Sequence, residues 1–250
     1  MVSRSKRHDL VFGRQPVLSL FEAGTPVEKV IFQRGATGEA IVALKDLCKR
    51  FRVPMQAVPR EALARMTSGN HQGVLAYTAE IGYQLLEDLL PFLYEEGASP
   101  FLVALDSVTD VRNFGAIART ALGAGAHGLV VGMRDAAPAN SEAIKASAGA
   151  LLSIPVCREL TMSSALEQMQ QHGLLRIGLA AEGEHFPWQE DLTIPFVIVA
   201  GAEGEGLSSA IRDQLDLVVK LPMPGDFDSY NVSVAVGMLA YEAAKQRQGG

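Results

Sequence analysis

The fold is decided by one stretch: Phe196-Val197-Ile198-Val199-Ala200-Gly201-Ala202-Glu203-Gly204-Glu205-Gly206-Leu207. Its apolar start predicts a buried strand, and its glycines predict a tight turn in which backbone approaches a ligand closely. The glycine spacing matches neither a P-loop nor a dinucleotide-binding turn. Because Glu203 and Glu205 would repel phosphate, a cationic ligand is favoured. A simple turn, whose acids favour the dipole of the following helix, fits the same residues equally well.

Two other polar loops precede predicted helices. The first is Ser229-Tyr230-Asn231-Val232-Ser233, at the start of a helix predicted over residues 231–246. Helix N-capping by Ser229 or Asn231 would need one polar side chain, and here several converge. The second loop runs from Asp106 into a helix predicted over residues 113–123, which carries Arg119. Arg119 lies about 200° from Ile117 around that helix, so it points away from the buried face, as a solvated arginine also would.

The sequence predicts two α/β domains. Residues 1–80 alternate short helices and strands and form the smaller domain, and residues 81–100, which end in Gly-Ala-Ser-Pro, are predicted to be a linker. In residues 101–250, apolar strands at 101–105, 128–131, 175–179, 196–200 and 217–221 alternate with helices. This order indicates a parallel sheet covered on both faces. Ligands of such sheets bind beyond the carboxyl ends of the strands, where the polar loops lie.

Composition and charge favour a soluble protein that meets nucleic acid. The 250 residues are 48% hydrophobic and 20% charged, with no apolar run near the roughly 20 residues of a membrane span. The basic N-terminus has no signal-type apolar stretch behind it, so we expect a cytoplasmic protein with no membrane partner. Residues 1–66 hold 12 Lys and Arg against six Asp and Glu, although the whole chain carries a net charge of −6. A basic lobe on an acidic body fits RNA binding, and a merely solvated basic surface would look the same.

No metal site is expected. Cys48, Cys157 and the five histidines lack metal-ligand spacing, and core packing is the favoured role of the cysteines. His71, in a polar turn before a predicted strand, serves either ordinary turn chemistry or RNA contact. Arg14, at a predicted helix start, is a similar case.

Together, the three loops resemble the motifs of the SpoU (TrmH-type) branch of the SPOUT RNA methyltransferases. Asn113 and Arg119 match its Asn-x5-Arg motif, Gly201–Leu207 matches Gly-x-Glu-Gly-x-Gly-Leu, and Ser229–Ser233 matches Ser-Leu-Asn-Val-Ser, in that order within residues 101–247. Residues 11–17 and 68–74 resemble the ribosomal-protein-like α/β substrate-binding domain of many such enzymes. The layout is similar to that of the RlmB-like enzymes. Val111 stands where Asp-Pro is usual, and Tyr230 replaces the common leucine.

The resemblance implies a deep trefoil knot in the C-terminal domain, S-adenosylmethionine as methyl donor, and a homodimer that pairs through the knot region and the last helix. The implied reaction is methylation of a guanosine 2′-hydroxyl in large-subunit rRNA, with 23S rRNA or its assembling particle as partner. A tRNA ribose 2′-O-methyltransferase and a non-catalytic RNA-binding or ribosome-assembly factor on the same fold are the alternatives. The implied site residues are, for catalysis, Arg119, Asn113, Glu203, Asn231 and Ser233; for the donor, Gly201, Leu221, Met223, Tyr230 and Ser229; and for RNA, Arg14, His71 and Gln72.

The resemblance assigns activation of the hydroxyl to Arg119. A guanidinium, with a pKa above about 12, is rarely a base. An alternative role for Arg119 is to orient the hydroxyl and stabilise the forming alkoxide, with a substrate phosphate as one candidate for the proton acceptor.

Overall fold

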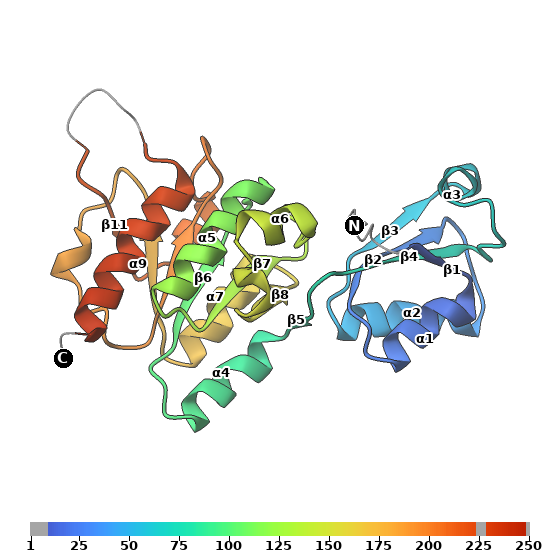
Figure 1. The fold of residues 1–250 in the computed structure, drawn as a ribbon, viewed down its shortest axis with the longest axis horizontal. Coiled ribbons are helices and arrows are strands. Elements are labelled where there is room, and N and C mark those ends of the chain that lie inside the picture. Colours follow the sequence, from blue (N-terminus) through green and yellow to red (C-terminus); the bar gives the residue numbers. More distant parts are fainter. Residues whose placement is uncertain (1–9, 224–228, 249–250) are drawn as a thin grey trace, which may run out of the picture. The chain divides into compact units, whose positions relative to one another are not determined.

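The computed structural model describes residues 10–223 and 229–248. The chain divides into two compact units, with the main boundary between Gly82 and Tyr83. Each unit is built on its own sheet (Figure 1).

The first unit holds a four-stranded sheet in the order β1-β4-β2-β3. Its strands are β1 (Leu10–Phe12), β4 (Val74–Thr78), β2 (Val27–Gln33) and β3 (Met55–Val58). Strand β4 runs antiparallel to β1 and β2, and β3 runs parallel to β2. The helices α1 (Arg14–Glu22) and α2 (Glu39–Arg50) cover one face, where Val30 and Phe32 are buried, and α3 (Arg60–Met66) covers the other through Leu63 and Ile31. Alternate residues of β2 therefore serve two cores.

The second unit holds a seven-stranded sheet in the order β11-β9-β10-β6-β7-β8-β5, and every pairing in it is parallel. The strands are β5 (Tyr83–Gln84), β6 (Phe101–Leu105), β7 (Gly128–Gly132), β8 (Val156–Glu159), β9 (Leu175–Leu179), β10 (Phe196–Ala200) and β11 (Leu217–Val219). The predicted parallel sheet is thus confirmed. All five residues of β6 and of β10 are buried, because helices cover both faces of the sheet.

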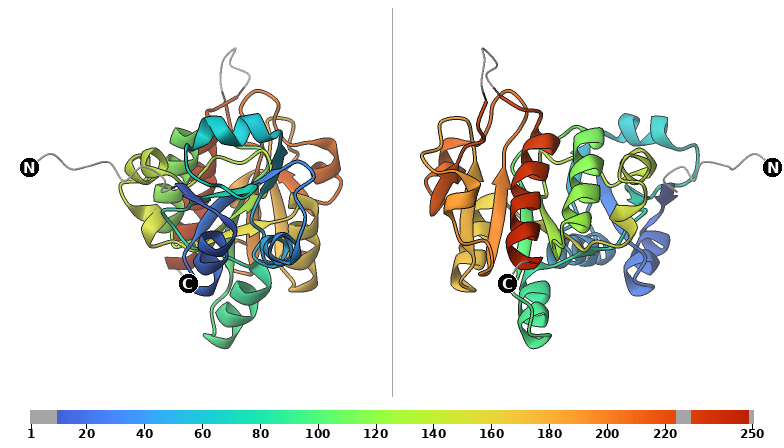
Figure 2. Two further views of the ribbon diagram at one scale, coloured as in Figure 1. Left: turned by 90° about the vertical axis from the view of Figure 1, so that its right-hand side faces the viewer. Right: turned by 60° about the vertical axis from the view of Figure 1, so that its left-hand side comes forward.

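Helices lie on both faces of this sheet. One face packs against α4 (Leu86–Glu95) and α7 (Met162–Gln171) through a shared apolar cluster. On the other face α5 (Val111–Gly123) and α9 (Val232–Gln248) lie side by side (Figures 1 and 2). The remaining elements are short: α6 (Ser141–Ala146), α8 (Ser209–Arg212) and the 3-10 turns Ala150–Leu152 and Pro187–Gln189.

The structure corrects several predicted boundaries. Residues 83–95, predicted to be linker, instead form β5 and α4 of the second unit, where β5 pairs with β8 and four leucines of α4 are buried. The helix expected after the glycine-rich turn is only the short α8, and β1 and β8 were not predicted. Both cysteines are buried, as core packing requires. The threading of the chain into a knot stays a prediction.

Candidate functional site

Two central strands deliver two of the polar loops to the same place. Strands β6 and β10 pair in parallel, with Leu105 opposite Ala200, so both strands end at the same level. The Asp106 amide then donates to the Ala200 carbonyl oxygen at 2.8 Å. The buried Asp106 carboxylate accepts hydrogen bonds from the Ser208 amide (3.2 Å) and hydroxyl (2.9 Å). These contacts tie the loop after β6 to the loop after β10.

The glycine-rich loop folds back on itself at Gly201. A Cβ on Gly201 would lie 2.1 Å from the carbonyl carbon of Gly206, far inside van der Waals contact. The Gly206 amide donates to the Ala202 carbonyl oxygen at 2.9 Å, and Gly206 has a φ of +70°, which favours glycine. This backbone closure leaves Glu203 and Glu205 exposed on the outside of the turn.

Three polar residues, one in the first turn of α5 and two in loops, meet in a hydrogen-bonded cluster, the polar hub: Asn113, Glu203 and Asn231. Asn113 donates from Nδ2 to the Glu203 carboxylate at 3.0 Å. Asn231 donates from Nδ2 to Asn113 Oδ1 at 3.0 Å and to Glu203 Oε1 at 3.4 Å. Residues separated by 90 and 118 positions in the chain are thus joined by side chains. The structure therefore brings together one residue from each of the three motifs.

Asn231 and Ser233 show that helix capping and the polar hub are compatible. Asn231 Oδ1 accepts from the Ser233 amide (2.9 Å) and hydroxyl (2.6 Å), which caps the first turn of α9. Because its oxygen is committed to the cap, the amide nitrogen of Asn231 faces Asn113 and Glu203. At the other helix, Asp110 caps α5 by accepting from the Arg112 and Asn113 amides at 2.6 and 3.2 Å. Both helix starts are thereby fixed beside the polar hub.

Arg119 stands apart from the polar hub. It lies on α5, six residues beyond Asn113, and its side chain is exposed. Among the residues that the structure describes, none forms a hydrogen bond or ion pair with it. A charged guanidinium with no internal partner is available to a ligand.

A cavity of about 650 Å³ lies beside the polar hub, and Glu203 belongs to both. All five residues predicted to hold the donor line it: Gly201, Leu221, Met223, Ser229 and Tyr230. The Tyr230 hydroxyl donates to the Pro222 carbonyl oxygen at 3.0 Å. The departure from leucine at this position therefore adds a hydrogen bond to the cavity wall.

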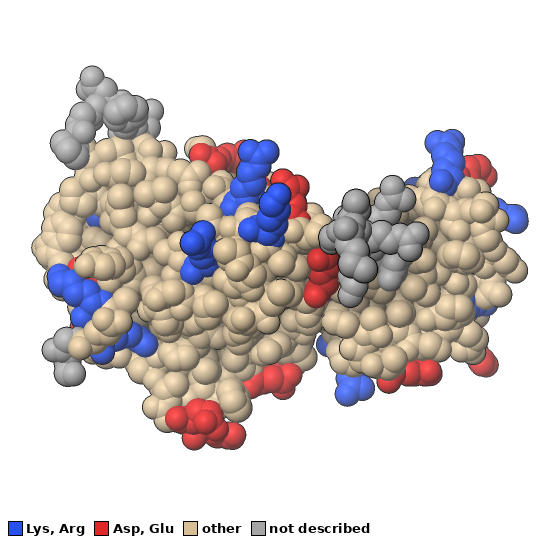
Figure 3. All heavy atoms as spheres, viewed as in Figure 1, with Lys and Arg blue, Asp and Glu red and all other residues tan. Residues whose placement is uncertain are grey.

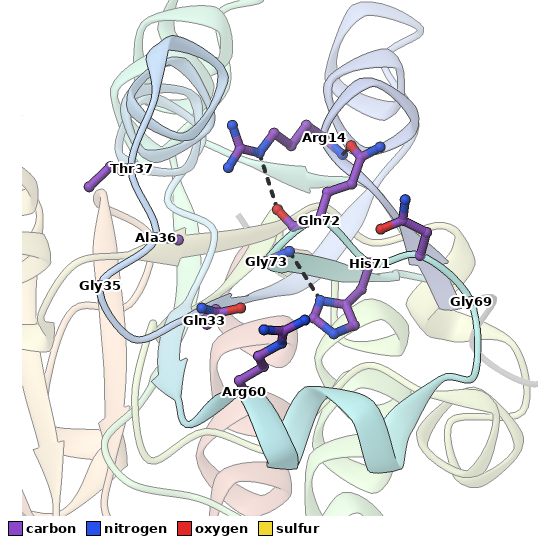
Figure 4. Close-up of a pocket in the computed structure, with 11 residues that line it drawn as sticks. Arg14, Gln33, Gly35, Ala36, Thr37, Arg60, Gly69, His71, Gln72 and Gly73 are labelled. Carbon is purple, nitrogen blue, oxygen red and sulfur yellow. Dashed lines mark hydrogen bonds between the residues drawn. The ribbon is translucent and has the colours of Figure 1, made fainter.

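The three residues predicted to contact RNA meet in the first unit. Arg14 donates from its amide to Gln72 Oε1 and from Nε to the Gln72 carbonyl oxygen, each at 3.1 Å. His71 Nδ1 accepts from the Gly73 amide at 3.0 Å, so His71 has the turn role considered from the sequence. All three side chains line one hollow (Figure 4).

Two kinds of feature are not found in residues 10–223 and 229–248. No group of three or more His, Cys, Asp or Glu side chains there could hold a metal ion. No helix in the same residues is both long enough and apolar enough to cross a membrane.

The model of the SpoU rRNA methylase family matches residues 100–241, more than half of the chain. The chain belongs to this family. A second model, for the substrate-binding domain of RNA 2′-O-ribose methyltransferases, matches residues 10–84. This SpoU methyltransferase is therefore an enzyme of RNA 2′-O-methylation, with the polar hub and the cavity inside its methylase region.

Relatives and solved structures agree with this assignment. A Bacillus subtilis protein named as the TrmH-family tRNA/rRNA methyltransferase YacO is 34% identical over 97% of this chain and 98% of its own. A tRNA/rRNA methyltransferase of Mycolicibacterium vanbaalenii is 36% identical over 96% of this chain and 77% of its own. The SpoU methyltransferase AviRb of Streptomyces viridochromogenes, solved with the cofactor AdoMet, has a TM-score of 0.62 at 26% identity and covers 96% of this chain and 91% of its own.

Several cavity residues of this SpoU methyltransferase were missed at the sequence level. They lie at the end of β9, in the loop after it, at the end of α8 and just after β11: Leu179, Glu182, Phe186, Arg212 and Lys220. Glu182 and Arg212 form an ion pair, and Lys220 Nζ lies 5.3 Å from the centroid of the Phe186 ring. Phe186 also stacks on the exposed Trp188 with ring centroids 4.8 Å apart. The loop after β9 starts at the carboxyl end of a strand in the same parallel sheet. Because ligands bind beyond these strand ends, this position could have indicated the loop as part of the site.

We predict that Gly201→Ala destabilises the protein by about 1–3 kcal/mol, because the new methyl group overlaps the Gly206 backbone. Gly123→Ala is the matched control, since a Cβ there meets nothing within 4 Å and Gly123 lies in α5. Urea unfolding of the two variants measures the difference. Equal stabilities would show that the loop opens at no cost.

Proposed function

We propose that this enzyme transfers a methyl group from S-adenosylmethionine to the 2′-hydroxyl of a guanosine in large-subunit rRNA. The observation that carries the proposal is the polar hub at the edge of the cavity, because it joins a donor-sized space to three converging polar side chains. An rRNA substrate places the reaction in the cytoplasm.

The cavity fits the chemistry of the donor. Its volume of about 650 Å³ is within the usual range for small-molecule sites. Leu221, Met223 and Tyr230 offer apolar surface for the adenosyl part, and the missing side chain of Gly201 lets backbone come close. The carboxylate of Glu203 suits a ligand that carries a sulfonium and an ammonium group. When bound, S-adenosylmethionine supplies an electrophilic methyl group on sulfur.

The chain's own side chains would prepare the nucleophile. The ribose hydroxyl must be held in line and must lose a proton. Arg119, exposed and without a partner among the described residues, would orient this hydroxyl and stabilise the developing alkoxide, while a phosphate oxygen of the RNA accepts the proton. Asn113, Glu203, Asn231 and Ser233 would position the ribose. The Glu203 carboxylate is already oriented by two amides, so it costs little to order when substrate arrives.

The first unit supports rRNA over tRNA as substrate. A separate α/β domain precedes the methylase region, whereas the tRNA enzymes of this family more often carry helical or basic extensions. Arg14, His71 and Gln72, held together in that unit, would contact the RNA.

We predict that 2′-O-methylguanosine disappears from one position of 23S rRNA in cells that lack the gene. Mapping of 2′-O-methyl sites in rRNA and tRNA, with and without the gene, makes the comparison. Loss of a tRNA site instead would favour the tRNA alternative. Unchanged maps, together with RNA binding but no binding of S-adenosylmethionine by calorimetry, would favour the non-catalytic alternative.

We predict that Arg119→Ala lowers methylation about 10²–10³-fold and leaves the affinity for S-adenosylmethionine nearly unchanged. Arg119→Lys should restore little activity, because an ammonium group lacks the planar fork of donors. Incorporation of labelled methyl groups measures the first quantity, and calorimetry measures the second. Weakened donor binding with normal turnover at saturating donor would refute this role.

We further propose a homodimer that pairs through α9. This helix buries Val236 and Leu239 in its own unit yet leaves Val234, Met238 and Tyr241 exposed, and these three lie at i, i+4 and i+7 on one side. An apolar stripe of this kind suits a second copy of the helix.

We predict that Met238→Glu shifts the protein from dimer to monomer in light scattering at micromolar concentration. Val42→Glu, at an exposed apolar residue of α2, is the control and should leave the dimer intact. A monomeric wild type would overturn the dimer without touching the assignment of the reaction.

A further inference from the structure

The hollow in the first unit is lined by more residues than the three that were predicted to contact RNA. Its volume is about 720 Å³. Apart from Arg14, His71 and Gln72, its lining includes the polar side chains Gln33, Thr37, Arg60 and Asn70. None of its lining residues in the described part of the chain is acidic. Figure 4 shows Arg14 entering from the start of α1 and Arg60 extending from the start of α3 toward His71.

Neither Arg14 nor Arg60 forms an ion pair with an acidic residue in the described part of the chain. Arg14 donates from Nε and from its amide to Gln72, which fixes its position and leaves its terminal nitrogens without a hydrogen-bond partner among the described residues. Space for this guanidinium comes from Gly38, since a Cβ there would lie 2.9 Å from an Arg14 terminal nitrogen. Arg60 is exposed and forms no hydrogen bond or ion pair with any residue in the described part of the chain. Two uncompensated guanidinium groups around one hollow favour an anion such as a phosphodiester.

The remaining lining suits a nucleobase. Because His71 Nδ1 accepts from the Gly73 amide, the ring of a neutral His71 carries its proton on Nε2, which is then a donor. Gln33 and Asn70 add amide groups that both donate and accept. Gln72 holds the loop in shape with a φ of +49°, a conformation stabilised here by its contacts with Arg14.

The size of the hollow and the charge of the protein surface favour unpaired RNA over duplex RNA as the ligand. A hollow of this volume takes a ligand of small-molecule size, such as one nucleotide, but a paired base would remain inside its helix and out of reach. On the face drawn in Figure 3, basic side chains are scattered among acidic and uncharged ones rather than joined in a continuous patch. Recognition by one shaped site fits this surface better than recognition of a long duplex by charge.

We infer that the hollow binds one unpaired nucleotide of the RNA substrate, with its phosphate between Arg14 and Arg60 and its base against His71, Gln33 and Asn70. The inference rests on the proposed RNA methyltransferase function and adds a recognition site within the first unit. It also assigns Arg60 and Gln33, which no sequence motif indicated, and Asn70, which lies in the stretch 68–74. The bound nucleotide selects the substrate and takes no part in methyl transfer.

The experiment uses the full-length protein and two fluorescently labelled RNAs: a hairpin with an open loop, and a blunt duplex of the same length. Anisotropy titrations give the affinity for each RNA over a series of salt concentrations. The wild type should prefer the hairpin. Arg60→Gln should weaken hairpin binding roughly tenfold, the equivalent of one charge-assisted hydrogen bond. It should also reduce the salt slope by about one, and change duplex binding little.

Arg65→Gln is the matched control, because Arg65 is an exposed arginine on the same helix and does not line the hollow. It should bind both RNAs like the wild type. Equal weakening by the two substitutions would overturn the inference, since charge alone would then explain binding. A wild type that binds duplex as tightly as hairpin would overturn it as well.

Donor binding separates this test from the proposed function. Arg60→Gln should bind S-adenosylmethionine with wild-type affinity in calorimetry, because Arg60 lies in the other unit from the donor cavity. If the protein fails to bind the donor but still distinguishes hairpin from duplex through Arg60, the proposed function fails and the nucleotide site stands.

Discussion

The register between β6 and β10 is the constraint on which the functional site depends. With Leu105 opposite Ala200, the two strands finish together, and the loops that follow them emerge at one edge of the sheet. A shift of this pairing would separate Asn113 from Glu203, whose side chains are joined at 3.0 Å. The packing of α9 against α5 then supplies Asn231. The positions of the polar side chains at this edge are thus set by the pairing of two buried apolar strands.

Continuous apolar strands were predictable from the sequence because burial on both faces of a sheet requires an uninterrupted run of apolar residues. Phe101–Leu105, Leu175–Leu179 and Phe196–Ala200 have the predicted bounds. Short or interrupted elements were not predictable: β5 has only two residues and gains its stability from pairing with β8, and α4 continues through Pro91, which usually ends a helix. Tertiary packing decided both, so the predicted linker was wrong.

Some features of the functional site could likewise be predicted from the sequence, and others could not. Proximity of the three loops follows from strand direction alone, but the partners within the polar hub do not, because hydrogen bonds across 90 and 118 residues leave no local spacing to find. The resemblance to a family nominated those residues before any geometry was known. It nominated nothing in the loop after β9, although Phe186 lines the same cavity. The sequence also held no indication of a binding role for Arg60, because an arginine at a helix start is common. Only the hollow beside it in the structure suggests that role.

The position of Arg119 has an evolutionary consequence. Its side chain is exposed and supports no other described residue, so folding places no selective pressure on it. In the mechanism proposed above, one substitution there would remove most of the activity and leave a folded protein that still has its substrate-binding unit. In a lineage with two gene copies, one copy could thus drift from modifying enzyme to binding factor in a single step, without passing through an unstable intermediate.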